Sequence, residues 1–417
     1  MEFQHELFNM HLRILFLRYH ANPVFGQSIN QYLWEFVLLM ATRIGVLRET
    51  DASENRVSMV PDLIGKISAM GAEVIVEKGA GSSSHFMDSE YSSAGAQLVG
   101  ERKEILGSSD VILTIHGLGS DEIKNARKGT ILIGMISLQG KDEVSNSMAN
   151  AGLTVFSLNL MPRISRAQTM DVLSSQSSIS GYRAVLLGAF HSPRLFPMLT
   201  TAAGTVRPAK VLVIGAGVAG LMAIATARRL GAVVEAYDIR KTAGEDVRSL
   251  GARFLETQVD ARASGGYARE LTPEEKKLQT DIISNAVSGA DVIITTASIP
   301  GRKAPVIISR DMIQKMKAGS VIIDLAADTG GNCEITRPGE TVIENDVSVL
   351  GPNNLPSEVP YQASQLYARN VLSFLPLLIS RESGIASSFE DEILKACLLM
   401  HNGELISGSK GKEAVKP

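Results

Sequence analysis

The sequence predicts an α/β protein with two parallel-sheet domains separated by a cleft. Three observations support this prediction. Short apolar runs alternate with helical segments between residues 43 and 160, and the same alternation starts again at Lys210. Strands that alternate with helices favour a parallel sheet covered on both faces. The chain has 417 residues, which suits two or three domains of about 150 residues each.

The first domain shows five apolar runs of strand length and two segments with helical spacing. The expected strands are residues 44–47, 74–76, 111–115, 131–136 and 154–157, and the expected helices are residues 61–70 and 121–127.

The second domain repeats this order, with strands expected at residues 211–214, 233–237, 292–295 and 321–325 and a helix at residues 221–230. After Pro360 the sequence becomes helical over residues 363–379, and we expect this segment to pack back on the first domain. The predicted domains are therefore residues 43–175 with 361–417 for the first, and 176–360 for the second, nucleotide-binding one.

Residues 1–42 form an extension of a different character. Residues 1–40 hold three of the seven histidines, five of the twelve phenylalanines and the only tryptophan, Trp34. They lack the basic, apolar and small-residue regions of a secretory signal. We interpret them as a non-structural extension, with Met40 as the true start, and an unusual targeting segment is the alternative.

Composition excludes several classes of protein. The chain is 45% apolar and 20% charged, with a net charge of −3, which is typical of a globular protein and argues against a nucleic-acid partner. Two cysteines, Cys333 and Cys397, cannot form a disulfide framework or a multi-cysteine metal site, so no metal is expected. They favour a reducing, intracellular compartment. The longest uncharged stretch, residues 211–227, is shorter than the ~20 apolar residues of a membrane span.

The strongest motif follows the first strand of the second domain. Gly215, Gly217 and Gly220 form a G-x-G-x-x-G turn between a strand and a helix, and the next strand ends at Asp238. This order is the Rossmann fingerprint, in which the glycines allow a tight turn, close approach of the pyrophosphate and close helix packing. The domains are therefore predicted to be Rossmann-like. Asp238 can accept hydrogen bonds from the ribose hydroxyls and would repel a 2′-phosphate, which favours NAD over NADP, although Arg240 and Lys241 weaken this argument.

A polar segment, residues 161–181, precedes this domain and is interpreted as a loop at the cleft. A nicotinamide carboxamide has an N–H donor and a carbonyl acceptor. Asp171 or Ser174 could accept from the first, and Arg163 could donate to the second. The alternative is a serine-rich linker that contains a helix cap.

These segments together resemble the NAD(H)-binding component of the proton-translocating NAD(P) transhydrogenase family, in the alanine dehydrogenase/transhydrogenase superfamily. The resemblance rests on the polar loop, the fingerprint, and the motifs ENRVSMVP, IPGRKAP and GGNCE, which begin at residues 54, 299 and 330. It implies that Arg163, Asp171 and Ser174 hold the nicotinamide and that Gln168 reaches toward NADP(H) on a partner. It also implies a mobile loop that carries Tyr267. Val218, Ile239, Arg240 and Ala297 complete the candidates for cofactor binding.

The residues that an amino-acid dehydrogenase would need are missing. The related alanine dehydrogenases place a Lys and a His beside the substrate for proton transfer. Here the corresponding positions hold Thr114 or His116 and Ser137, although Arg56 resembles their substrate-binding arginine. Hydride transfer between two nicotinamides needs orientation and exclusion of water rather than a proton donor.

The resemblance therefore implies an NAD(H)-binding transhydrogenase subunit that passes hydride between NADH and NADP⁺ held by a partner subunit, coupled to proton translocation. It implies a homodimer that assembles with an NADP(H)-binding and a membrane-spanning subunit. We expect it to be cytoplasmic and peripheral, on the inner face of a bacterial inner membrane. An alanine-type dehydrogenase and a non-catalytic NAD-sensing module are the alternatives. Asp328 could lie near the nicotinamide ribose or only begin a loop, and Cys333 is interpreted as a packing residue.

Overall fold

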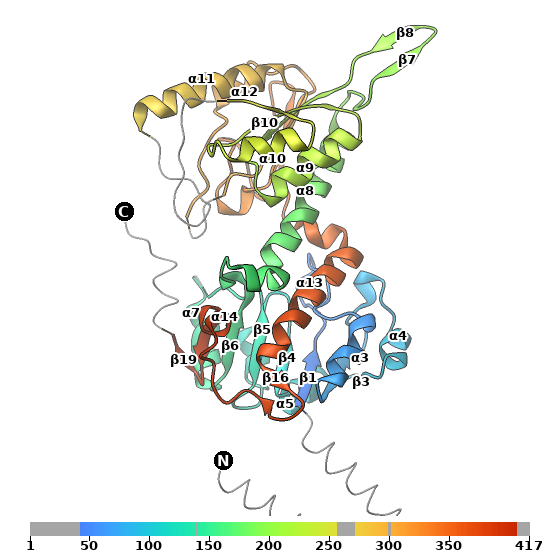
Figure 1. Cartoon of the computed structure of the whole chain (residues 1–417), viewed down its shortest axis with the longest axis vertical. Coiled ribbons are helices and arrows are strands. Elements are labelled where there is room, and N and C mark those ends of the chain that lie inside the picture. The colour runs from blue at the N-terminus through green and yellow to red at the C-terminus, as the bar shows by residue number, and fades with distance from the viewer. Residues whose placement is uncertain (1–41, 139, 257–271, 299–301, 407–417) are drawn as a thin grey trace, which may run out of the picture.

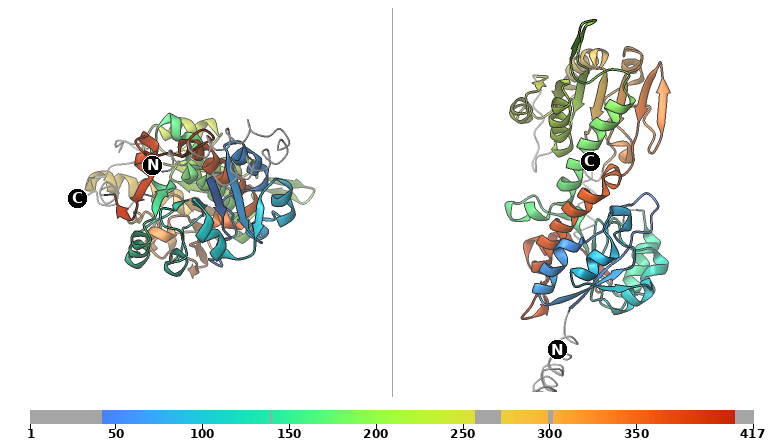
Figure 2. Two further views of the ribbon diagram at one scale, coloured as in Figure 1. Left: turned by 90° about the horizontal axis from the view of Figure 1, so that it is seen from below. Right: turned by 90° about the vertical axis from the view of Figure 1, so that its right-hand side faces the viewer.

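The computed structural model describes residues 42–406, apart from residues 139, 257–271 and 299–301. It has two lobes, each built on one large sheet, and two helices run between them: α8 (Val172–His191) and α13 (Pro360–Phe374). Figure 1 and Figure 2 both show α8 and α13 crossing from one lobe to the other. Tyr267 and the loop expected around it lie outside the described residues.

The first lobe contains an eight-stranded sheet in the order β19-β18-β6-β5-β4-β1-β2-β3. Its strands pair in parallel from β3 to β6, whereas β18 joins β6 antiparallel and β19 joins β18 antiparallel. The strands are β1 (Thr42–Val46), β2 (Ala72–Glu77), β3 (Gln97–Val99), β4 (Val111–Leu113), β5 (Ile131–Gly134), β6 (Thr154–Ser157), β18 (Leu398–His401) and β19 (Glu404–Leu405). The helices are α3 (Pro61–Ala69), α4 (Asp88–Ser93), α5 (Arg102–Ser108), α6 (Ser120–Ile123), α7 (Asp142–Asn150) and α14 (Glu392–Cys397).

The second lobe contains a seven-stranded sheet in the order β11-β10-β9-β12-β13-β15-β14, in which only β14 is antiparallel. The strands are β9 (Lys210–Ile214), β10 (Val233–Tyr237), β11 (Arg253–Phe254), β12 (Val292–Thr295), β13 (Val321–Asp324), β14 (Thr341–Glu344) and β15 (Val347–Leu350). The helices are α9 (Val218–Arg229), α10 (Ala243–Ser249), α11 (Pro273–Gly289) and α12 (Arg310–Ile313). The strand order reverses between β9 and β12, where open α/β sheets bind ligands beyond the carboxyl ends of their strands.

Each sheet has an apolar core on both faces, which explains why the central strands are apolar without alternation. All four residues of β12 and of β13 are buried. One core of the first lobe includes Tyr367, Val371 and Phe374 of α13, so the C-terminal segment packs on the first sheet. The predicted α/β fold with two parallel-dominated sheets is confirmed. The domain boundary expected after residue 175 falls inside α8, and the cleft between the domains stays a prediction.

Several elements differ from those expected. Residues 172–181 are helical, so the loop prediction was wrong there. Asp171 caps α8, and the hydroxyls of Ser178 and Ser180 donate to carbonyls four residues back, which satisfies them inside the helix. The helix expected at residues 363–379 begins at Pro360 and ends at Phe374, because Pro376 cannot continue it. The expected helix at residues 121–127 is reduced to α6.

A hairpin of β7 (Leu199–Thr201) and β8 (Gly204–Val206) follows α8 and projects from the second lobe (Figure 1). All six strand residues are exposed. The sequence did not predict this hairpin. It also did not predict β3, β11, β14, β15, β18, β19 or the two-residue strands β16 (Ile379–Ser380) and β17 (Gly384–Ile385).

Candidate functional site

The turn between β9 and α9 has the geometry of a phosphate-binding turn. Gly215 has a φ of +96°, which favours glycine. A Cβ on Gly220 would lie 2.9 Å from the carbonyl carbon of Gly215 and closer still to its oxygen, so α9 can approach β9 only with glycine there. A Cβ on Gly217, in contrast, would have nothing within 4 Å. The first turn of α9, which begins at Val218, therefore presents open backbone N–H groups, as anion binding requires.

Asp238 follows β10 and is buried, with 8% of its surface exposed. Its Oδ2 accepts from the backbone N–H of Ala216 at 2.7 Å, so the carboxylate is tied to the glycine turn. The guanidinium of Arg240 donates to both oxygens, with Nε–Oδ1 and Nη2–Oδ2 distances of 2.9 Å. This hydrogen bonding raises the pKa of Arg240. Ile239 lies between the two side chains in the sequence and is half-buried.

The segment after β12 is held by Asn332. Its amide group donates to the carbonyls of Ala297 and Pro305 at 2.8 and 2.9 Å, and its Oδ1 accepts from the N–H of Ala297 at 3.0 Å. Asp324, at the end of β13, accepts from the N–H groups of Asn332 and Cys333 and from the hydroxyls of Thr295 and Thr336. Sequence reasoning named Ala297 but missed the roles of Asn332 and Asp324. An acidic residue that ends a buried strand, with an asparagine in the next turn, was the available signal.

Asp171 and Ser174 lie together at the start of α8. Asp171 Oδ1 accepts from the backbone N–H of Ser174 at 3.0 Å, and Oδ2 accepts from its hydroxyl at 2.5 Å. The helix cap that was considered as the alternative is therefore present. Arg163 and Gln168 are exposed in the segment before the cap. Asn370 of α13 holds this segment, because its amide donates to the carbonyl of Thr169 at 2.7 Å.

Arg56 lies in a buried polar cluster of the first lobe and is only 3% exposed. It donates to both oxygens of Glu54, with Nε–Oε1 and Nη2–Oε2 distances of 2.8 and 2.6 Å. It also donates to Gln176 of α8 at 2.7 Å and to Asn354 at 3.1 Å. His116 Nε2 is 2.7 Å from Glu54 Oε2. Sequence reasoning found Arg56 and His116 but missed Glu54, Gln176 and Asn354.

The charges in this cluster shift two carboxyl groups in opposite directions. Burial alone would raise the pKa of Glu54, but hydrogen bonds from Arg56 and His116 and the charge of Arg56 hold that pKa well below its usual range. Burial raises the pKa of Glu49, partly offset by hydrogen bonds from the backbone N–H groups of Ile115 and His116. Because Glu54 and its neighbours occupy the guanidinium, Arg56 has no edge free for a substrate carboxylate.

The remaining polar candidates lie apart from this cluster. Thr114 is buried, and its carbonyl accepts from the hydroxyl of Tyr367 at 2.7 Å, whereas Ser137 is exposed. Burial raises the pKa of the Cys333 thiol to about 11, which suits a packing role. Desolvation raises the pKa of Asp328.

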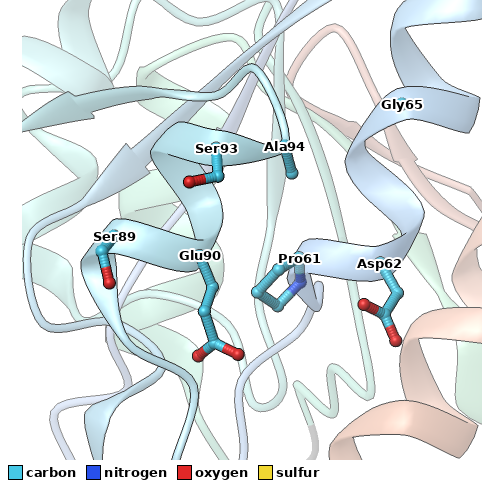
Figure 3. Close-up of a pocket in the computed structure, with 7 residues that line it drawn as sticks. All are labelled: Pro61, Asp62, Gly65, Ser89, Glu90, Ser93 and Ala94. Atoms are coloured by element: carbon cyan, nitrogen blue, oxygen red, sulfur yellow. The ribbon is translucent and has the colours of Figure 1, made fainter.

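Two cavities lie in the first lobe, and none of the predicted nucleotide-binding residues lines either of them. One, of about 560 Å³, lies between α3 and α4, and Figure 3 shows Asp62 and Glu90 on its two sides. The other, of about 280 Å³, is lined by the segment from Arg48 to Arg56 with Ala80 and Ser83. Among the described side chains, no group of His, Cys, Asp and Glu could hold a metal ion. Within the same part of the chain, no helix combines the length and apolarity that a membrane crossing needs.

Comparisons with known proteins agree with this geometry. Residues 45–180 match the family model "Alanine dehydrogenase/PNT, N-terminal domain", and residues 184–408 match "Alanine dehydrogenase/PNT, C-terminal domain". The first of the separately encoded pieces of NAD(P) transhydrogenase subunit alpha of Rhodospirillum rubrum is 41% identical over 374 residues, covering 87% of this chain and 97% of that one. NAD(P) transhydrogenase subunit alpha of Haemophilus influenzae is 41% identical over 380 residues, covering 90% and 73%. Alanine dehydrogenase of Mycobacterium tuberculosis is 28% identical over 372 residues, covering 88% and 95%.

Two solved structures are similar over almost the whole described chain. The transhydrogenase from Sinorhizobium meliloti superposes with a TM-score of 0.80 at 41% identity, covering 87% of this chain and 100% of that one. An L-alanine dehydrogenase superposes with a TM-score of 0.77 at 25% identity, covering 89% and 99%.

Proposed function

Because this chain belongs to the alanine dehydrogenase/PNT family, we propose that it is the NAD(H)-binding subunit of a proton-translocating NAD(P) transhydrogenase. In this role it passes hydride directly between NADH and NADP⁺ held by a partner subunit, and the transfer is coupled to proton translocation. The observation that carries the proposal is the placement of the Asp171–Ser174 pair on α8, which packs against the glycine turn and α9.

The described residues fit a bound dinucleotide. The open first turn of α9 at Gly217 and Val218 would hold the pyrophosphate, and Asp238 would accept from the adenosine ribose once Arg240 shares its carboxylate. Ala297 would line the site at the end of β12, with Ile239 beside Asp238. Asp171, Ser174 and Arg163 would orient the nicotinamide carboxamide. Bound NAD(H) supplies the hydride.

The chain's own residues would orient the ring and exclude water. Orientation in near-attack geometry, with reacting atoms roughly 3–3.5 Å apart, is the main catalytic requirement for direct hydride transfer. Gln168 is exposed in the segment before α8, where a partner that carries NADP(H) could contact it. We extend the proposal to Tyr267, which the family resemblance places in a loop over the nucleotide.

The cluster around Arg56 argues against the alanine dehydrogenase alternative. In that alternative the arginine must bind the substrate carboxylate. Here Glu54, Gln176 and Asn354 already take its donors. His116 is paired with Glu54, and its proton would leave the buried carboxylate without that partner.

We also propose a homodimer that assembles with NADP(H)-binding and membrane-spanning subunits on the inner face of a bacterial membrane. An exposed apolar surface at the end of α8 and on the hairpin supports self-association. Phe190 is 82% exposed and Met198 63% exposed, and Leu195, Leu199 and Val206 lie near them in sequence with about half of their surfaces exposed. Large exposed apolar patches typically mark protein interfaces.

The test mixes the purified chain with NADH, an NADP⁺ analogue and a recombinant NADP(H)-binding transhydrogenase domain, and follows hydride transfer by stopped-flow absorbance. The chain alone should bind NADH but transfer slowly, because its described residues offer one glycine fingerprint. Addition of the partner should give rapid transfer. Rapid transfer by the chain alone, or no stimulation by the partner, would overturn the proposal. In the second case NADH binding without transfer would favour the NAD-sensing module.

A further inference from the structure

Helix α8 joins the candidate nicotinamide-orienting residues to the nucleotide lobe through two glycines. A Cβ on Gly181 would lie 2.9 Å from the carbonyl carbon of Ala219 in α9, and closer still to its oxygen. A Cβ on Gly188 would lie 2.7 Å from Cγ1 of Val292 in β12. Real Cβ atoms do not make contacts this short, so α8 sits against the second lobe at a distance that only glycine allows.

The spacing of these residues places them on one side of the helix. Ser174, Gly181 and Gly188 follow one another at intervals of seven residues, which is close to two turns of an α-helix. The side of α8 that contacts α9 therefore also carries Ser174. The hydroxyl of Ser174 donates to Asp171, so the capping pair lies at the end of the same side. About 10 Å of helix separates Ser174 from Gly181 at 1.5 Å per residue.

Helix α9 cannot move to make room for a larger residue at Gly181. Gly220 already brings α9 into backbone contact with Gly215 of the turn, and Ala223 and Ile224 are buried in the core. Any added atom at residue 181 must therefore displace α8, together with Asp171 and Ser174.

We infer that Gly181, supported by Gly188, is a positioning residue for hydride transfer. Through α8 it sets the distance between the phosphate-binding turn and the Asp171–Ser174 pair. The inference rests on the proposed function, because it requires that this pair orients the nicotinamide. A methyl group at residue 181 needs a shift of about 1 Å to reach ordinary van der Waals distance, and a misplacement of about 1 Å can slow a reaction about 100-fold.

The experiment compares Gly181→Ala with Gly65→Ala in the full chain, assayed with the NADP(H)-binding domain. Gly65 is a matched control, because it lies inside α3 and a Cβ there would have nothing within 4 Å. We expect Gly181→Ala to lower the transfer rate at saturating NADH about 100-fold, with the Kd for NADH changed less than about threefold. Gly65→Ala should match the wild type in both measurements.

A double variant separates positioning from general damage. If Gly181 acts through Asp171, then Asp171→Asn combined with Gly181→Ala should be no slower than the slower single variant. Multiplied losses would overturn the inference, as would an unchanged rate in folded Gly181→Ala or a loss of rate matched by weaker NADH binding. Absence of transfer by the wild type with its partner would instead overturn the proposed function, so the two failures are distinguishable.

If Gly181→Ala does not fold, Gly188→Ala provides the test, because its clash is with the Val292 side chain rather than with backbone. It should slow transfer about tenfold or less, in keeping with a smaller displacement of α8, and adding Val292→Ala should restore the rate. No slowing, or slowing without this rescue, would overturn the inference.

Discussion

Replacement of Asp171 by asparagine separates its structural role from its proposed catalytic role. Asparagine caps helices about as well as aspartate, so the N-cap bond to the Ser174 N–H should survive and stability should change by less than about 0.5 kcal/mol. The negative charge is lost. We therefore expect the melting temperature to stay almost unchanged while hydride transfer with the partner domain falls.

The size of the fall follows from the contact that is weakened. A hydrogen bond to a charged acceptor contributes about 1.5–3 kcal/mol. At 1.36 kcal/mol per factor of ten, its loss corresponds to a rate reduced roughly 10- to 150-fold. NADH affinity should change little, because Asp238 and the glycine turn hold the other half of the molecule.

Stopped-flow absorbance gives the transfer rate, calorimetry the NADH affinity and circular dichroism the melting temperature. Asp391→Asn is the matched control, since Asp391 caps α14 through the N–H groups of Ile393 and Leu394. That variant should transfer at the wild-type rate. A rate for Asp171→Asn within twofold of wild type would mean that Asp171 is only a helix cap.

Three further predictions concern Asp238, Arg56 and Glu54. Calorimetry should show NADH binding at least tenfold, or about 1.4 kcal/mol, more tightly than NADPH; equal affinities would mean that Asp238 does not face the ribose. Purified chain with NAD and L-alanine should show no turnover near the ordinary enzyme rate of ~10 s⁻¹, because Arg56 is occupied; such turnover would favour the dehydrogenase alternative. Glu54→Gln should destabilise the first lobe by about 3–5 kcal/mol at neutral pH, since it leaves Arg56 buried without its partner charge. Because folding lowers the pKa of Glu54, its stabilisation is complete above about pH 4.5 and is lost as the pH falls further; the variant's thermal melts should lack this part of the acid dependence, and an unchanged profile would contradict the assignment.

The sequence predicted the central parallel strands well because their signal is local. Strands such as β9 and β12 are short apolar runs, and the glycine turn has a fixed spacing. The edge strands were missed because their pairing is not local. Strand β18 pairs with β6 across 240 residues of chain, and nothing in its own residues indicates that partner.

The candidate site was predicted unevenly for the same reason. The turn at Gly215 and the acid at Asp238 follow from spacing within one βαβ unit. The contacts of Glu54 with Asn354 and of Arg56 with Gln176 join residues 300 and 120 positions apart. Serine-rich residues 172–181 were misread because helix propensity is weak for serine, whereas the cap and the packing against α9 decide the outcome.

The late position of β18 also affects how the protein is made. Strand β6 ends at Ser157, but the strand that covers its edge begins at Leu398. At about 5–20 residues per second, a ribosome needs roughly 10–50 s to synthesise the chain between them. During that time the edge of β6 stays open while the nucleotide lobe, encoded in between, can already fold. The half of the protein that is synthesised first is therefore completed last, and nascent chains are most exposed to misassociation at that edge.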